Sequence, residues 1–312
     1  MKSLFLLCLL VAAALASAAD FDYGLKARAV AGDVHAFIGR SEDFDRLNGG
    51  NIVNTGFIVA TDGIVVIDTG PSLRYGQQMR RAIAAVSGLP VVLAINTHHH
   101  PDHFLGNQAY ADTAIGALPG TARGIAAEGN AFAENLFRMS GDWLRGTEVL
   151  APNRALVAGN LEVAGRRLRL LALDGHTGAD LAVYDEKSGI LFAGDLVFNG
   201  RAPTTPHADI GHWLRALDRL EAIAAEPGFV ALVPGHGEVA RDAAPIRRTR
   251  AWLNWLQTTM RDAAQAGLDM NELLARPLPA AFADLPLAAS EYRRSVSHLF
   301  PAAEQEALPD AR

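Results

Sequence analysis

Cysteine is nearly absent from the 312-residue sequence, where it occurs once, as Cys8. This residue lies in an N-terminal segment that we expect to be removed. The mature chain would then have no disulfide, no thiolate metal ligand and no cysteine nucleophile. Chemistry that depends on a thiol is therefore excluded.

That N-terminal segment, residues 1–19, has the pattern of a secretory signal peptide. Lys2 precedes the apolar run Leu4–Ala16, and the small-residue sequence A-S-A follows. A positive start, an apolar core of roughly 7–15 residues and an A-x-A end are typical of such signals. We expect cleavage after Ala18 or Ala19 and a periplasmic or secreted mature protein.

Long apolar runs and an excess of positive charge are also missing. No segment has the roughly 20 consecutive apolar residues that a transmembrane helix needs, so no membrane span is expected. The 28 basic and 34 acidic residues give a formal charge of −6. This balance argues against a nucleic-acid or anionic-membrane surface and leaves a small-molecule substrate as the expected partner.

The sequence does contain an alternation of strand-like and helical segments. Strands are expected at residues 51–60, 64–68, 91–95, 161–163, 168–173, 181–184, 190–193 and 229–233. Helices are expected at residues 71–87 and 210–225, and in much of the chain from residue 243 onward. The pattern predicts an α/β fold with two sheets packed face to face and helices on the outer faces. We expect one domain over residues 20–240 and a helical C-terminal extension, residues 241–312, packed on it.

The most unusual stretch is N-T-H-H-H-P-D-H, residues 96–103, directly after the strand-like run 91–95. His98, His100, Asp102 and His103 offer three imidazoles and a carboxylate, donors that suit Zn²⁺. Four such ligands within six residues cannot close a tetrahedron about one ion and leave a reactive position. They could be shared between two ions if other loops supply further ligands.

Three more strand-like runs end in a histidine or aspartate beside glycine. They carry His176 in D-G-H-T-G, Asp195 in A-G-D and His236 in P-G-H-G. Glycine allows a positive φ and a close approach of the backbone to a crowded centre. We therefore expect these three segments to converge on the histidine-rich loop.

The motif order H-x-H-x-D-H, G-H-T-x-G, G-D and G-H-G resembles that of the metallo-β-lactamase superfamily of zinc hydrolases, over roughly residues 30–240. The resemblance implies a four-layer αββα sandwich. It also implies that Asp68, at the end of V-V-I-D, braces the metal loop. Aspartate at position 195, where some β-lactamases of the family have cysteine, is more typical of the thioesterase and general hydrolase branches.

The same resemblance implies two zinc ions per chain. One would be held by His98, His100 and His176. The other would be held by Asp102, His103 and His236, with Asp195 bridging the two ions. Asp102 would also orient the nucleophile, which makes it the expected catalytic residue.

A closer resemblance rests on the export signal and on the segments L-N-G-G-N-I-V-N-T-G and S-E-Y-R-R-S-V-S-H-L-F. Together they are similar to exported zinc metallohydrolases of sulfur-oxidation and quinoprotein-associated gene sets. This likeness implies an association with a redox or quinoprotein pathway but defines no substrate.

The leading hypothesis is an exported dinuclear zinc hydrolase that uses a metal-bound hydroxide to cleave a small ester, thioester or cyclic amide. Three alternatives stay open: a β-lactamase, a mononuclear iron persulfide dioxygenase with three ligands, and a non-catalytic periplasmic metal-binding protein. Substrate specificity would come from residues 113–150, the loop 199–209 and the C-terminal helices, whose geometry the sequence does not reveal.

The remaining histidines carry weaker expectations. His99 should point away from the metal cluster because its neighbours on both sides are the expected ligands. His207, in the loop after Asp195, could line the substrate cleft. Ordinary surface or core roles are expected for His35, His212 and His298.

Overall fold

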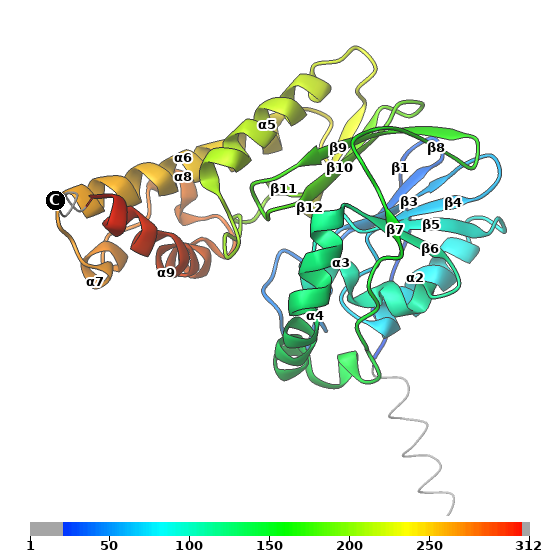
Figure 1. Cartoon of the computed structure of the whole chain (residues 1–312), viewed down its shortest axis with the longest axis horizontal. Helices are drawn as coiled ribbons and strands as arrows, with labels where there is room; N and C mark the ends of the chain where they lie inside the picture. Colours follow the sequence, from blue (N-terminus) through cyan, green and yellow to red (C-terminus); the bar gives the residue numbers. More distant parts are fainter. Residues whose placement is uncertain (1–20, 308–312) are drawn as a thin grey trace, which may run out of the picture.

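The computed structural model describes residues 21–307, so the expected signal peptide, residues 1–19, lies outside the described chain. Two sheets pack face to face and helices cover their outer faces, while the last helices of the chain gather at one end (Figure 1). The predicted αββα sandwich with a helical C-terminal part is confirmed.

The first sheet has the strand order β1-β2-β3-β4-β5-β6-β7. Its strands are β1 (Arg28–Ala31), β2 (Val34–Phe37), β3 (Thr55–Val59), β4 (Ile64–Ile67), β5 (Val91–Ile95), β6 (Ala114–Ala117) and β7 (Arg154–Ala155). Strands β1 to β4 pair antiparallel, and β4 to β7 pair parallel. The carboxyl ends of β4 and β5 therefore meet at one edge of the sheet, where the histidine-rich loop begins.

Helix α2 (Leu73–Ala84) covers the outer face of this sheet. Its N-cap residue, Ser72, accepts a hydrogen bond from Tyr75 N, which satisfies a backbone donor that the helix itself leaves free. Its buried residues Tyr75, Met79 and Ile83 recur at helical spacing and pack against Phe57 of β3 and other apolar residues of the sheet.

The second sheet has the order β12-β11-β10-β9-β8. Its strands are β8 (Gly159–Val163), β9 (Arg166–Leu173), β10 (Asp180–Asp185), β11 (Ile190–Asn199) and β12 (Ala231–Gly237). All neighbours pair antiparallel except β11 and β12, which are parallel and are connected through helix α5 (Ile210–Ala224). Helix α5 buries Trp213, Leu217 and Leu220 against the outer face of this sheet.

The core between the sheets is made by residues that alternate along their strands. Ile58 and Leu93 from the first sheet belong to one apolar cluster with Leu170, Val183 and Phe192 from the second. Because successive side chains of a strand point to opposite faces, the intervening residues face the helices instead. Buried rows on both faces explain why these strands read as nearly continuous apolar runs.

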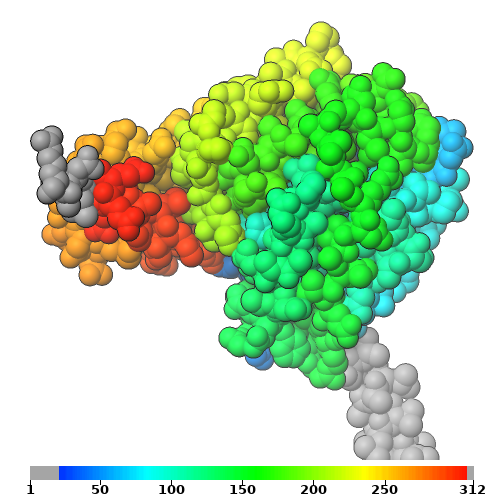
Figure 2. All heavy atoms as spheres, viewed as in Figure 1, coloured from blue at the N-terminus to red at the C-terminus, as the bar shows by residue number. Residues whose placement is uncertain are grey.

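Two further helical regions flank the sandwich. Short helix α3 (Pro101–Phe104) follows the histidine-rich loop, and long helix α4 (Pro119–Ser140) lies beside it. The C-terminal helices are α6 (Ala244–Gln265), α7 (Met270–Leu274), α8 (Ala280–Ala283) and α9 (Ala288–Ala307). They form an arm that projects from the sandwich next to α5 (Figure 2). Among residues 21–307, every helix is too short or too polar to cross a bilayer.

Several expected boundaries differ from the structure. Residues 51–54 form a turn, so the expected strand 51–60 is reduced to β3, and β1 and β2 were not anticipated. Strand β11 was expected to end at residue 193 and β12 at residue 233, but they continue to Asn199 and Gly237. Apolar residues follow Asp195 in β11, and register shifts at Gly194 absorb the irregularity in the pairing of the two strands. Asp195 and His236 therefore lie within paired strands rather than on free loops.

Candidate metal centre

Asp68 organises the histidine-rich loop. Its carboxylate accepts hydrogen bonds of 2.8 Å each from Thr97 N, Thr97 Oγ1 and His103 Nδ1. Asp68 itself has a φ of 55°, a conformation that aspartate tolerates better than most residues. Asp68 therefore braces the loop, as the family resemblance implied, because it binds Thr97 near the start of the loop and His103 near its end.

One group of potential ligands contains three histidines and an aspartate. His98, His100, His176 and Asp195 are buried, and one ligand atom from each lies within 4.8 Å of the others. His100 Nδ1 and His176 Nε2 are 2.8 Å apart, and both are close enough to share one ion. The histidine-rich loop and the G-H-T-G loop after β9 thus converge as expected.

A second group lies beside the first. Asp102, His103 and His236 are buried and likewise have ligand atoms within 4.8 Å of one another. His236 Nε2 is 3.5 Å from Asp102 Oδ2, and His103 Nε2 is 3.8 Å from the same oxygen.

Asp195 lies between the two groups. Its Oδ1 is 3.1 Å from His103 Nε2, and its Oδ2 is 3.1 Å from His236 Nε2 and 3.5 Å from His176 Nε2. A Cβ added to Gly235 on the neighbouring strand would come within 1.9 Å of Asp195 Oδ1. Glycine at position 235 is therefore what allows the two strands to bring Asp195 and His236 together.

The donor atoms fit a divalent metal. His98 Nε2, His103 Nε2 and Asp195 Oδ1 are buried without a hydrogen bond of good geometry. Buried polar atoms are normally partnered, so three such atoms within the two adjoining ligand groups indicate a site for a cation. Imidazoles and carboxylates without thiolates are the donor set of catalytic rather than closed structural zinc sites.

Hydrogen bonds at the outer ring nitrogens orient the ligands. His98 Nδ1 lies 3.1 Å from Thr97 Oγ1, His103 Nδ1 donates to Asp68, and His236 Nδ1 donates to the backbone oxygen of Ile52 at 2.7 Å. Partners of this kind fix the tautomer and the ring direction of metal-binding histidines.

Protonation differs between the two groups. Burial lowers the pKa of His98 and His100 well below the ordinary histidine value and lowers that of His176 to about 3. Burial also opposes charge on His103, but Asp195, Asp68 and Asp102 outweigh it and hold the pKa of His103 well above its usual range. Before any metal binds, therefore, the side chains of His98, His100 and His176 are neutral, whereas His103 carries a second ring proton and a positive charge.

Two supporting residues were not identified from the sequence. Asp180 accepts hydrogen bonds from the backbone N–H groups of His176 and Thr177 at 3.0 and 2.9 Å, and burial raises its pKa to about 7. Asn54 donates to the backbone oxygens of Pro234 and Gly237 on either side of His236. The spacing T-G-A-D is turn chemistry that could have revealed Asp180, whereas Asn54 is 180 residues from its partner in the chain.

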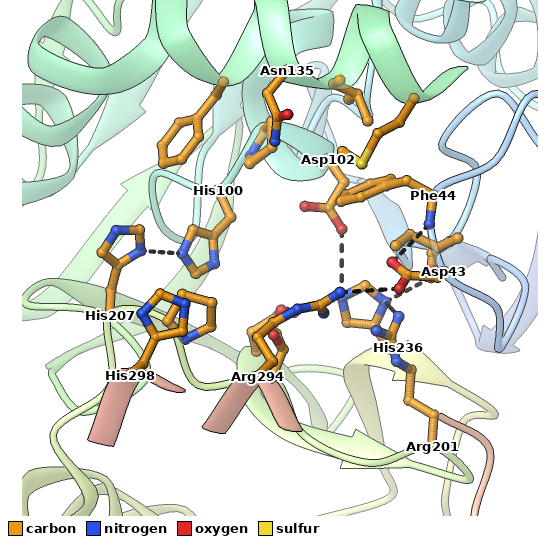
Figure 3. Close-up of a pocket in the computed structure, with 18 residues that line it drawn as sticks. Asp43, Phe44, His100, Asp102, Asn135, Arg201, His207, His236, Arg294 and His298 are labelled. Atoms are coloured by element: carbon orange, nitrogen blue, oxygen red, sulfur yellow. Dashed lines mark hydrogen bonds and ion pairs between the residues drawn. The ribbon is translucent and has the colours of Figure 1, made fainter. Parts of the chain in front are cut away.

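A cavity of about 430 Å³ opens over the two groups (Figure 3). His100, Asp102, Asp195 and His236 form its floor. Helix α4 supplies an apolar wall, and α9 supplies Arg294 and His298. His298, for which an ordinary surface or core role was expected, lines the cavity that the sandwich and α9 form together.

Charged side chains connect α9 to the rim of the cavity. Arg294 donates to Glu291 at 2.7 Å and to Asp43 at 3.0 Å, and Arg201 donates to buried Glu291 at 3.1 Å. Asp43 lies in the segment after β2, and Arg201 follows β11. The network therefore fixes the C-terminal helix against two other segments that line the same cavity.

The other histidines divide as follows. His99 belongs to neither of these two ligand groups and packs against α4, where a Cβ on Gly124 would meet its ring. His207 lines the cavity, as the sequence had left open. His35 stacks on Phe57, and His212 pairs with Asp174 at 2.6 Å, so both have ordinary roles.

The αββα sandwich and its clustered histidine and aspartate donors define a metal-dependent hydrolase. Residues 48–236 match the family model described as the metallo-beta-lactamase superfamily. This match covers more than half of the chain, and the protein belongs to that superfamily, as its motifs had implied.

Known proteins with similar sequences are also hydrolases. The chain is 26% identical to the acyl-coenzyme A thioesterase MBLAC2 of Homo sapiens over 60% of its own length and 74% of the relative. It is 31% identical to the hydroxyacylglutathione hydrolase of Synechococcus sp. over 36% of its length and 37% of the relative.

Solved structures agree on the fold. A metallo-beta-lactamase from Pontibacter korlensis superposes with a TM-score of 0.59 at 22% identity, covering 74% of this chain and 99% of that one. A metallo-beta-lactamase from Hirschia baltica gives 0.58 at 18% identity, covering 73% and 97%. At these identities the likeness concerns the fold alone.

Proposed function

We propose that this protein is an exported dinuclear zinc hydrolase whose preferred substrates are acyl thioesters, with small esters and cyclic amides as further candidates. The observation that carries the proposal is Asp195, which lies within 3.1 to 3.5 Å of histidines from both ligand groups. A shared carboxylate between two sets of three ligands is suited to two ions rather than one.

His98, His100 and His176 would hold one zinc ion, and Asp102, His103 and His236 the other, with Asp195 between them. When bound, such ions lower the pKa of water and polarise a carbonyl oxygen. Asp102 lines the cavity at its floor. Its carboxylate would orient the attacking water and accept a proton from it.

The cavity walls support an acyl substrate. Phe132, Leu136 and Met139 from α4 form an apolar surface beside the ligand groups, where an acyl chain would exclude bulk water from the reacting carbonyl. The resemblance to named thioesterases supports thioesters as the first candidates in this proposal. β-Lactams stay a second candidate because the fold is shared with the β-lactamases above.

Export is part of the proposal and rests on the sequence of residues 1–19. A role next to a redox or quinoprotein pathway is proposed on resemblance alone. Cell fractionation and N-terminal sequencing of the mature protein would test export. A product that retains residues 1–19, found in the cytoplasm, would contradict it.

Two measurements test the enzymatic proposal together. Mass spectrometry of the purified protein should give two zinc ions per chain, and a panel of an acyl-coenzyme A, a glutathione thioester, a simple ester and nitrocefin should show turnover of the thioesters first. The Asp102→Asn variant should lose most of this turnover. One iron per chain with oxygen consumption on a persulfide would instead favour a dioxygenase.

A further inference from the structure

His207 contacts a ligand histidine from outside the expected ligand set. His100 uses Nδ1 on the side of His176, at 2.8 Å from His176 Nε2, so its Nε2 points the other way. That Nε2 lies 2.8 Å from His207 Nδ1 (Figure 3). On its far side, His207 Nε2 lies 3.4 Å from Glu128 Oε2 of helix α4.

The tautomers of this chain follow from the first contact. If His100 offers the lone pair of Nδ1 to a metal, its Nε2 must carry the hydrogen, because a neutral imidazole has only one N–H. His100 Nε2–H then donates to His207 Nδ1. His207 must carry its own hydrogen on Nε2, and this N–H faces the carboxylate of Glu128, which only accepts.

We propose that His207 and Glu128 are positioning residues that hold His100 in its metal-binding tautomer and ring orientation. The inference rests on the metal centre proposed above. His207 would act through His100 and need not touch the substrate.

This support differs from that of the other ligands. Thr97, Asp68 and Ile52 O, which orient His98, His103 and His236, are buried inside the sandwich. The side chains of His207 and Glu128 are 35% and 43% exposed, and they come from the loop after β11 and from α4. One metal ligand is therefore fixed from the rim of the cavity, where substrate would enter.

A third metal ion is the competing explanation of the same cluster. His99, His100 and His207 have ligand atoms within 4.8 Å of one another, and His99 Nε2 lies 3.8 Å from Glu128 Oε1. An ion at His100 Nε2 would require His100 to lose both ring hydrogens while it also serves the main centre. The hydrogen-bonded chain needs no such deprotonation, and we favour it.

The test measures zinc affinity by competition with a chromogenic chelator in wild-type protein, His207→Ala and His207→Asn. We expect His207→Ala to bind one of its two ions about 10- to 100-fold more weakly, the usual effect of removing such a partner. In His207→Asn, the amide oxygen can replace Nδ1 as the acceptor, and affinity should return to within about threefold of wild type. Glu128→Leu should give a smaller loss than His207→Ala, because its effect is transmitted through His207.

His99→Gln is the matched control, because His99 belongs to the same cluster but makes no hydrogen bond to a ligand. It should keep the wild-type zinc affinity. At saturating zinc, kcat of His207→Ala should recover most of its loss, which a residue that touches the reacting atoms would not allow. Far-ultraviolet circular dichroism should show that the variants are folded.

Each other result has a defined meaning. Wild-type affinity for both ions in folded His207→Ala would overturn the positioning role while leaving the proposed hydrolase intact. Three ions in wild type, falling to two in both His99→Gln and His207→Ala, would replace it with a third metal site. Wild-type protein that takes up no divalent metal would overturn both the positioning role and the proposed function.

Discussion

The two halves of the candidate metal centre differ in the charge they hold before any ion binds. The three-histidine half is neutral, because burial lowers the pKa values of His98, His100 and His176. The other half holds a proton on His103, whose pKa is raised by the surrounding carboxylates against the effect of burial. An ion entering the first half displaces no proton, whereas an ion entering the second half must displace one.

The comparison shows that two sets of similar ligands can differ in their protonation before a metal binds. Histidines that are crowded together and kept from water stay available as neutral donors. The carboxylates of Asp68, Asp102 and Asp195 raise the pKa of His103 and so favour its cationic form. The first half can thus bind an ion without releasing a proton, whereas the second must release one.

The largest effect is expected where the halves meet. Asp195→Asn should lower turnover by about a thousandfold or more, because it removes the negative charge that lies between the two ligand groups. Metal analysis should show the loss of at least one zinc equivalent. Asp218→Asn, on an exposed side chain of α5, is the control. Near-normal turnover of Asp195→Asn would mean that the two halves act independently.

Asp68→Asn should separate the halves. Asp68 accepts from Thr97 N with one oxygen and from Thr97 Oγ1 and His103 Nδ1 with the other. The neutral asparagine amide has one acceptor oxygen and cannot keep all three hydrogen bonds, so the second half should bind zinc about 10- to 100-fold more weakly. The three-histidine half should lose less, because only His98 is connected to Asp68, through Thr97. Stepwise chelator titration measures both affinities. An equal loss at both ions would contradict this separation.

The dependence of zinc affinity on pH should also distinguish the halves. Between about pH 6 and 8, affinity of the second half should rise about tenfold for each unit of pH until the raised pKa of His103 is passed, because one proton is released per ion. Affinity of the three-histidine half should stay nearly constant, since its pKa values lie below this range. Calorimetry in buffers of different ionisation enthalpy would count the released protons. If the binding of each ion released a proton, the two halves would not differ in protonation as expected.

The smallest effect is expected from the cavity wall. Met139→Ala should lower kcat/KM about five- to tenfold for a long acyl thioester, because apolar contact area is lost. It should leave acetyl thioester turnover and both zinc affinities almost unchanged, since Met139 lies on α4 and contacts the cavity rather than the ligands. A matching loss on the acetyl substrate would show that the wall acts on the metal centre.

Much of the fold could be predicted because its strands are buried on both faces and read as apolar runs. Strand β5 matches its expected bounds, and helices α2 and α5 fall within theirs. The short strands β1 and β2 were missed, since four mixed residues each give little periodicity. The division of the chain near residue 240 stays a prediction.

The candidate site was predictable where ligands are close to glycine and to strand ends. The seven expected ligands lie in two adjoining groups, although their binding of metal stays a prediction. The cavity wall could not be derived, because Met139, Arg201 and Arg294 are brought together by packing between segments far apart in the chain. Nothing in the local sequence of α9 distinguishes a residue that lines a cavity from one on a solvent-exposed helix.

Helix α9, which places Arg294 and His298 over the floor of the cavity, has an evolutionary consequence. All seven expected ligands come earlier in the chain. Substitutions in the final helices could therefore change the substrate preference while all seven expected ligands stay in place.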